Sequence, residues 1–106
     1  MSKKVIIYVT CKDRKEAEFI AQALIEDRLC ACANILGEVT SMFWWKKKIE
    51  HQGEVAMILK SREELVRDIV EKIRALHSYE CPCVIALPIV DGYEGFLSWI
   101  EEETQL

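Results

Sequence analysis

Three stretches of the chain are short and continuously apolar, which is the pattern of a strand buried within a sheet. The first, residues 5–10, is rich in β-branched side chains. The other two are residues 29–36 and residues 84–90, and Pro88 late in the last one favours a sheet edge or a strand end. The pattern therefore predicts three strands outside the central part of the chain.

Two longer stretches repeat their apolar side chains at helical spacing. Residues 14–28 and residues 65–76 each predict an amphipathic helix, and the second has the clearest helical period in the chain. Each helix is expected to begin with a capping box, formed by Asp13 with Glu16 and by Ser61 with Glu64.

Residues 38–61 predict a long β-hairpin around which the rest of the chain is organised. Its first arm is rich in β-branched and aromatic residues, and its second arm alternates between apolar and polar residues. We expect the turn at His51-Gln52-Gly53, because Gly53 can adopt the positive φ of a tight turn. Gly37 is expected to mark a bend or bulge just before the first arm.

The first arm of this hairpin carries large apolar side chains on both of its faces, because side chains alternate along a strand. We expect one face to carry Val39, Phe43, Trp45 and Ile49, and the other to carry Met42 and Trp44. The helices of the chain can cover one face. A second copy of the chain is expected to cover the other, so the hairpin predicts an obligate oligomer.

The expected order of elements is strand, helix, strand, strand, helix, strand, followed by a short amphipathic helix over residues 93–100. This order consists of two halves, each of two strands and a helix, which a hairpin joins. Such halves form the split βαβ, ferredoxin-like sandwich. We therefore predict an α+β fold in which the two longer helices cover one face of the sheet. Residues 1–106 are expected to form a single domain.

Composition narrows the possible functions. The chain has 106 residues, of which 51% are hydrophobic and 30% charged, with a net charge of −4. An acidic chain lacks the basic stripe that phosphate binding needs, so nucleic acid is not an expected partner. The apolar runs are too short for a signal peptide or a membrane span, so we expect a cytoplasmic protein. Its five cysteines are then expected to be reduced thiols.

Four of these cysteines form two C-x-C pairs, Cys30 with Cys32 and Cys81 with Cys83, and Cys11 follows the first strand. Thiolates suit soft metals such as Cu(I) and Zn(II). A buried cysteine also packs as a small hydrophobic residue. We favour this packing role for Cys30, while for Cys32 both interpretations stay open.

His77 closes the second predicted helix, and a histidine at this place is typical of a helix C-cap. It is followed within six residues by Tyr79, Cys81 and Cys83. Because imidazole and thiolate ligands both suit copper, this neighbourhood also indicates a metal ligand. The other histidine, His51, is expected to be a solvated turn residue.

Catalysis is not expected, because the sequence shows no nucleophile with a base and an orienting group, and no glycine-rich phosphate loop. Lys60 follows the apolar end of the second hairpin arm. Its ammonium group is expected either to reach into solvent or to face an interface pocket.

Several motifs, in order along nearly the whole chain, together resemble the CutA family of divalent-cation tolerance proteins. They are Arg28-Leu29-x-Ala31-Cys32-x-Asn34, Ser41-x-Phe43-x-Trp45, Ile58-Leu59-Lys60-Ser61, His77-x-Tyr79-x-x-Pro82, Leu87-Pro88-Ile89 and Phe96-Leu97-x-Trp99. The resemblance implies a ferredoxin-like subunit that assembles as a homotrimer through edge-to-edge strand pairing. This agrees with the oligomer expected from the hairpin.

The resemblance also implies a site for copper(II) or another divalent cation. His77 matches the family's histidine before the motif tyrosine, and Cys32 matches its second-strand cysteine. The family's first-strand cysteine aligns with Val9 here, and Cys11 follows two residues later. The expected metal ligands are therefore His77 with Cys32 or a nearby thiol.

Four further residues match recurrent family positions and are expected to line a cleft between subunits: Trp45, Lys60, Tyr79 and Trp99. Two functions follow as hypotheses. The first is a non-catalytic homotrimer that binds copper(II) weakly, in cation tolerance or the response to metal ions. The alternative is a non-catalytic signalling or scaffold trimer that binds a small anionic ligand or a protein partner at this cleft.

Overall fold

The computed structural model describes residues 2–105 and has the α+β architecture that the sequence predicts. Within these residues, four antiparallel strands form a sheet in the order β2-β3-β1-β4, with bounds β1 Lys4–Cys11, β2 Cys32–Trp45, β3 Lys48–Arg62 and β4 Val84–Pro88. The helices are α1 Arg14–Glu26, α2 Val66–Leu76 and α3 Glu94–Glu103, and a 3-10 turn, Glu63–Leu65, precedes α2. This is the order of the ferredoxin-like βαββαβ sandwich, with α3 added.

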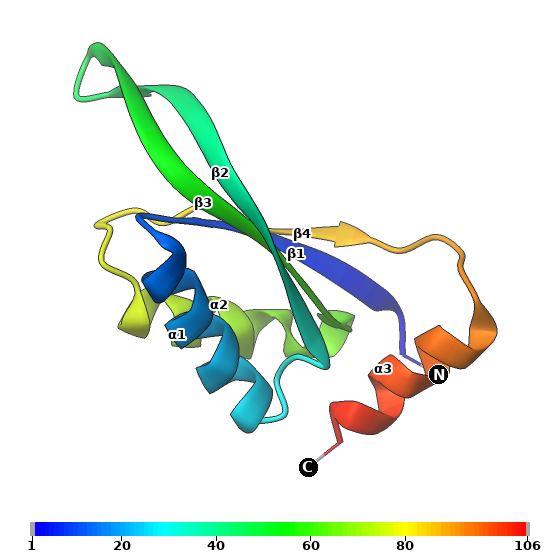
Figure 1. The fold of residues 1–106 in the computed structure, drawn as a ribbon. Coiled ribbons are helices and arrows are strands. Elements are labelled where there is room, and N and C mark those ends of the chain that lie inside the picture. Colours follow the sequence, from blue (N-terminus) through cyan, green and yellow to red (C-terminus); the bar gives the residue numbers. More distant parts are fainter. Residues whose placement is uncertain (1, 106) are drawn as a thin grey trace.

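The hydrophobic core lies between the sheet and the helices α1 and α2, which are side by side on one of its faces (Figure 1). Alternate residues of the central strands point into it, because side chains alternate along a strand. Its largest buried members include Ile7, Ile20, Leu24, Met57, Leu59, Ile69 and Ile73. Burying each such side chain contributes roughly 1.5–3 kcal/mol. None of the helices within residues 2–105 is long and apolar enough to span a membrane.

The hairpin turn lies nearer the amino terminus than the sequence predicts. β2 and β3 are joined through Lys46 and Lys47, whose φ angles of 49° and 69° are the left-handed values of a two-residue hairpin turn. The residues expected in the turn lie inside the hairpin instead, where His51 pairs with Met42 and Gly53 with Thr40. A turn at residues 51–53 would leave the beginning of β2 unpaired, because the second arm would be too short to reach it.

Gly37 forms the predicted bulge in β2. Its φ of 112° is a left-handed value that glycine adopts without strain, and the pairing with β3 shifts register between Ile35 and Gly37. The bulge separates the half of β2 that pairs over the core from the half that continues into the hairpin tip.

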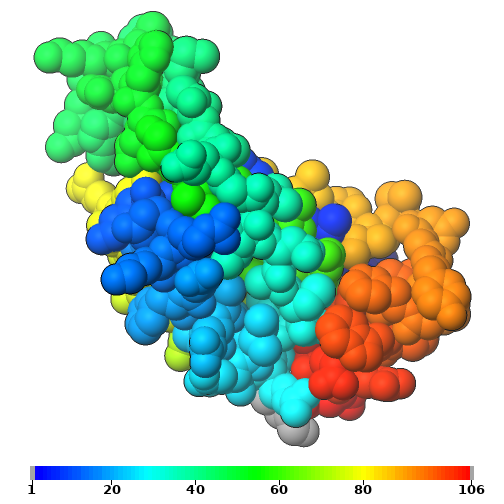
Figure 2. Space-filling model, in the orientation of Figure 1, coloured from blue at the N-terminus to red at the C-terminus, as the bar shows by residue number. Residues whose placement is uncertain are grey.

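The hairpin tip projects beyond the body of the molecule, as Figure 1 and Figure 2 show. Trp44 is 71% exposed and Trp45 is 37% exposed. The expected placement of Ile49 on the same face as Trp45 is wrong. Ile49 is opposite Trp44 in the strand pairing and therefore shares the face of Trp44. The expectation that the chain's helices cover one face is also wrong for the tip, which extends past α1 and α2.

Asp13 caps α1 as predicted. Its Oδ1 accepts a hydrogen bond from Glu16 N at 2.8 Å, and Glu16 Oε1 accepts one from Lys12 N at 3.0 Å. The second predicted capping box does not form, because Ser61 still belongs to β3 and its hydroxyl donates to Leu29 O at 2.5 Å. The 3-10 turn takes the place of a side-chain cap at the start of α2.

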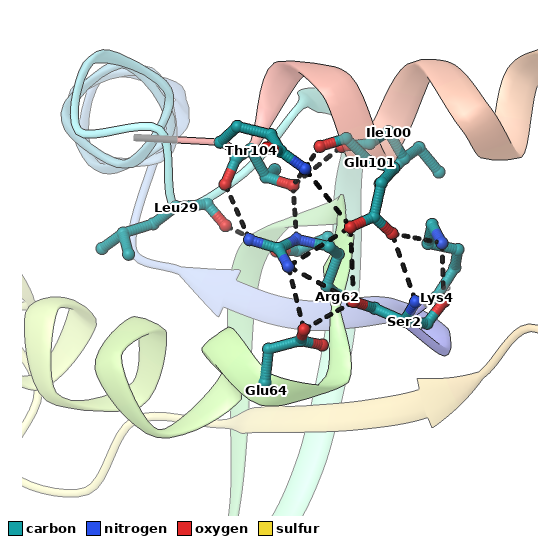
Figure 3. Close-up of polar contacts among 10 residues, drawn as sticks. Ser2, Lys4, Leu29, Arg62, Glu64, Ile100, Glu101 and Thr104 are labelled. Carbon is teal, nitrogen blue, oxygen red and sulfur yellow. Dashed lines mark hydrogen bonds and ion pairs between the residues drawn. The ribbon is translucent and has the colours of Figure 1, made fainter.

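A network of ion pairs and hydrogen bonds fixes α3 to the sheet (Figure 3). The buried Lys4 ammonium at the start of β1 lies 2.8 Å from Glu101 Oε1 on α3. Arg62, at the end of β3, donates from Nε to Thr104 Oγ1 at 2.8 Å. The carboxyl-terminal helix is therefore attached to both central strands through charged side chains.

Candidate functional site

Three potential metal ligands from different elements converge where β1 ends. Cys11 is the last residue of β1, Glu16 lies in the first turn of α1, and His77 is the C-cap of α2. The Cys11 sulfur, a Glu16 carboxylate oxygen and a His77 ring nitrogen all lie within 4.8 Å of one another. We refer to these three residues as the ligand cluster.

His77 is buried, and both of its ring nitrogens have hydrogen-bond partners. Nε2 lies 2.8 Å from the carbonyl oxygen of Thr10, and Nδ1 lies 3.1 Å from Tyr79 N. A carbonyl oxygen only accepts and a backbone N–H only donates, so these partners assign the ring proton to Nε2. The lone pair of Nδ1 accepts the hydrogen bond from Tyr79 N, and Glu16 Oε1 lies 3.9 Å from the same nitrogen. A metal-bound histidine is oriented in the same way when its other nitrogen donates to a carbonyl.

Glu16 is held in place by backbone donors from two segments. Its Oε1 accepts from Lys12 N at 3.0 Å and its Oε2 from Ser78 N at 2.8 Å. Burial opposes ionisation of this carboxyl group, but the hydrogen bonds from Lys12 and Ser78 outweigh it and hold the pKa of Glu16 below its usual range. The cluster therefore contains a fixed carboxylate.

Cys11 is fully buried beside this carboxylate. Burial raises the pKa of the Cys11 thiol to about 12, and the carboxylates of Glu16 and Glu54 raise it in the same direction. A metal ion that binds here has to displace the thiol proton and the hydrogen bond from Tyr79 to His77. Since sulfur, nitrogen and oxygen donors are all present at ligand spacing, the cluster fits a divalent transition metal.

Cys32 lies away from this cluster. It pairs with Lys60, which in turn pairs with Ile6 near the start of β1, whereas His77 contacts Thr10 near its end. The structure therefore does not bring Cys32 and His77 together within one chain. The thiol beside His77 is that of Cys11, which the sequence interpretation left unassigned, and Glu16 was identified there only as a helix cap.

Trp45 and Tyr79, two of the four predicted cleft residues, line the same cleft between the hairpin and the segment before β4. The cleft has a volume of about 780 Å³, and its walls include the carboxylates of Glu50, Glu54 and Glu80. The Tyr79 hydroxyl accepts a hydrogen bond from Gln52 Nε2 at 2.8 Å. Burial, and next the carboxylate of Glu54, raise the pKa of Tyr79. Three carboxylates make this cleft unsuited to a small anion.

Lys60 and Trp99, the other two predicted cleft residues, lie together elsewhere. Lys60 Nζ contacts Asn34 Oδ1 and is 5.8 Å from the centre of the Phe96 ring. Phe96 stacks on Trp99 with a centroid distance of 5.5 Å. Within one chain, the four predicted cleft residues therefore form two separate groups.

Comparisons with known proteins identify the family. The family model described as CutA1 divalent ion tolerance protein matches residues 5–103. The "Divalent-cation tolerance protein CutA" of Archaeoglobus fulgidus is 44% identical over 99 residues, which are 93% of this chain and 96% of that relative. "Protein CutA" of Mus musculus is 42% identical over 98 residues, which are 92% of this chain but only 55% of the mouse protein.

A solved structure gives the same result. The structure titled "Structure of the Periplasmic divalent cation tolerance protein CutA from Archaeoglobus fulgidus" is similar to this chain with a TM-score of 0.93 and 43% sequence identity. The similarity covers 96% of this chain and 99% of that one. On the family match, the relatives and the fold together, this chain belongs to the CutA1 divalent ion tolerance protein family.

Proposed function

We propose that the chain binds a divalent cation, copper(II) in the first instance, and takes part in divalent-cation tolerance without catalysis. The family and the names of its relatives support the tolerance role. The observation that carries the metal site is the convergence of Cys11, Glu16 and His77 within 4.8 Å. Thiolate, carboxylate and imidazole together suit copper(II) and zinc(II), and a bound cation would supply the positive charge that this acidic pocket lacks.

Cys32 could act as a metal ligand together with His77 only if chains assemble. Because Cys32 and His77 are near opposite ends of β1 in one chain, Cys32 could reach a histidine only on another copy. Substitution of Cys32 therefore distinguishes a ligand set within the subunit from one shared between subunits.

The assembly that we propose is a cytoplasmic homotrimer in which residues 1–106 of each chain form one domain. β2 and β4 are the two edges of the sheet that residues 2–105 form, so each edge can pair with another copy. Exposed apolar side chains lie along these edges and on the tip, including Leu36, Met42, Trp44, Ile85 and Leu87. All five cysteines are free thiols, which fits a reducing compartment.

Native mass spectrometry of the reduced protein, with and without a small excess of Cu(II), tests both the metal site and the homotrimer. We expect a trimer that binds one copper ion per chain. The variants C11S and H77Q should lose the copper, because each removes a ligand. In H77Q, the glutamine side chain can still donate a hydrogen bond to Thr10 O. H51A is the matched control, because His51 is exposed and lies outside the ligand cluster.

Equal copper binding by wild type, C11S and H77Q would contradict the ligand cluster. Copper loss in C32S but not in C11S would assign the site to an interface between subunits. A trimer that binds no copper would contradict the metal proposal and leave the assembly intact, whereas a monomer would contradict the assembly.

A further inference from the structure

The segment before β4 places two thiols in the cleft between the hairpin and that segment. Cys81 is exposed and Cys83 is half-buried, and both line the cleft. Neither residue belongs to the ligand cluster of Cys11, Glu16 and His77. This C-x-C pair is therefore a second group of potential metal ligands that the divalent-cation site does not use.

The backbone between these two thiols is short and restricted. Pro82 lies between them and fixes its own φ near −65°, which limits the conformations that the pair can adopt. A direct disulfide requires the two sulfur atoms to lie about 2 Å apart with a narrow range of dihedral angles. A metal ion between two thiolates allows roughly twice that separation, since each metal–sulfur bond is about 2.3 Å long. Binding an ion therefore demands a less exact approach of the two sulfur atoms than a disulfide does.

We propose that Cys81 and Cys83 form a two-coordinate site for a soft monovalent cation, Cu(I). Two thiol protons leave to solvent, two sulfur–copper bonds form, and no electron is transferred. Thiolates select Cu(I) over harder cations, because soft ligands bind soft metals. The chain would then hold two oxidation states of copper in different places, Cu(II) at the ligand cluster and Cu(I) at the cleft.

The part of the cleft around Cys83 is acidic and partly enclosed. Glu54, which is 7% exposed, and Tyr79 line the same cleft. Burial, and next the Glu54 carboxylate, raise the pKa of the Cys83 thiol. The same carboxylates attract an incoming cation, which has to displace the thiol proton of Cys83 in order to bind.

The other C-x-C pair of the chain shows that spacing alone does not make such a site. Cys30 is 1% exposed and belongs to the hydrophobic core, so an ion cannot reach it without opening the core. Burial also raises the pKa of the Cys30 thiol to about 12. Cys32, its half-buried partner, therefore provides a matched control with the same sequence spacing.

The test is an anaerobic titration of the reduced protein with Cu(I), in competition with the coloured chelator bathocuproine. We expect wild type to withdraw one Cu(I) per chain from the chelator. C81S and C83S should each weaken this binding by about tenfold or more, because two-coordinate binding needs both sulfurs. C32S should bind as wild type does. Thermal melting of C81S, which changes an exposed side chain, checks that the fold is retained.

Unchanged Cu(I) binding in the C81S/C83S double variant would overturn this inference. Cu(I) loss in H77Q or C11S without loss in C81S would also overturn it, because the ion would then belong to the ligand cluster. The proposed function is tested separately, since C81S/C83S should keep Cu(II) and H77Q should keep Cu(I).

Discussion

His77 joins three separate parts of the chain through one imidazole ring. It bonds to Thr10 of β1 and Tyr79 of the following segment, and it lies 3.9 Å from Glu16 of α1. The ring also packs against Tyr79 with a centroid distance of 4.6 Å. His77 therefore has a structural role that does not depend on metal.

Replacing His77 by alanine should lower the free energy of unfolding by about 1–3 kcal/mol, because the buried Thr10 carbonyl loses its donor. H77Q keeps a donor and should lose less. Urea denaturation without metal measures both changes. H51A alters an exposed histidine and should stay within about 0.5 kcal/mol of wild type. Equal losses in H77A and H51A would contradict the structural role.

Cys30 connects stability to alkaline pH. Burial raises the pKa of its thiol from 9.0 to about 12. The contribution of this thiol to folding stability is therefore complete below about pH 9, where the folded and unfolded chains both hold the proton. It is lost as the pH rises toward 12, because the unfolded chain releases the proton first. The slope from this thiol reaches about 1.4 kcal/mol per pH unit.

Urea denaturation at several pH values above 9 checks this expectation. The stability of C30A should decline less steeply with pH than that of wild type. C81A, which changes an exposed thiol, is the control. Parallel curves for wild type and C30A would show that the Cys30 thiol does not contribute.

At the scale of the elements, α3 depends on charged contacts with β1 and β3. The Lys4 ammonium holds the pKa of the Glu101 carboxyl below its usual range. A carboxyl group with a lowered pKa stabilises the fold above its unfolded pKa of about 4.3, and this contribution is lost as the pH falls through the folded value.

E101Q should therefore be less stable than wild type at neutral pH, by about 1 kcal/mol, because the buried Lys4 loses its charged partner. The difference should shrink as the pH falls below about 4, where wild type also loses the charge. Thermal melting between neutral and acidic pH measures it. Glu102→Gln, one residue away on α3, is the control. A constant difference between E101Q and wild type would contradict the charge argument.

The elements that local chemistry determines could be predicted from the sequence. The Asp13 cap and the Gly37 bulge depend on one or a few neighbouring residues, and both are confirmed. The hairpin turn was misplaced because its position depends on pairing over the whole length of β2 and β3. Ser61 resembled a cap, but its hydroxyl bonds to the distant carbonyl of Leu29.

In the candidate site, too, contacts between residues close in sequence could be predicted, whereas contacts made by the fold could not. His77 could be singled out from the residues that follow it, since they are close in sequence. Its neighbours Cys11 and Glu16 could not, because the contact between Glu16 and Ser78 joins residues 62 positions apart. Only the packing of the end of α2 against the end of β1 and the start of α1 brings these groups together.

At the scale of the whole molecule, the hairpin tip and the two edge strands expose apolar side chains within the described residues. Trp44 is 71% exposed, although its aromatic surface favours burial. A second copy would remove this surface from water.

W45A should weaken assembly by about 3–5 kcal/mol per chain, if a neighbouring copy completes the burial of this ring. W44A should act in the same direction without changing the fold of the single chain, because Trp44 is largely exposed there. Size-exclusion chromatography with light scattering over a dilution series measures the subunit count. K47A, at the turn, is the control. Unchanged assembly in both tryptophan variants would contradict the proposed interface.

The projecting hairpin has a consequence for amide hydrogen exchange. From the pair of Val39 with Glu54 to the turn, the backbone of the tip pairs only between β2 and β3, and Figure 1 shows this part extending past the helices. In a separate chain, this segment should open locally and take up deuterium well before the strands over the core. Slow uptake at the tip would therefore report directly that another chain covers it, and its dependence on protein concentration would follow subunit exchange in solution.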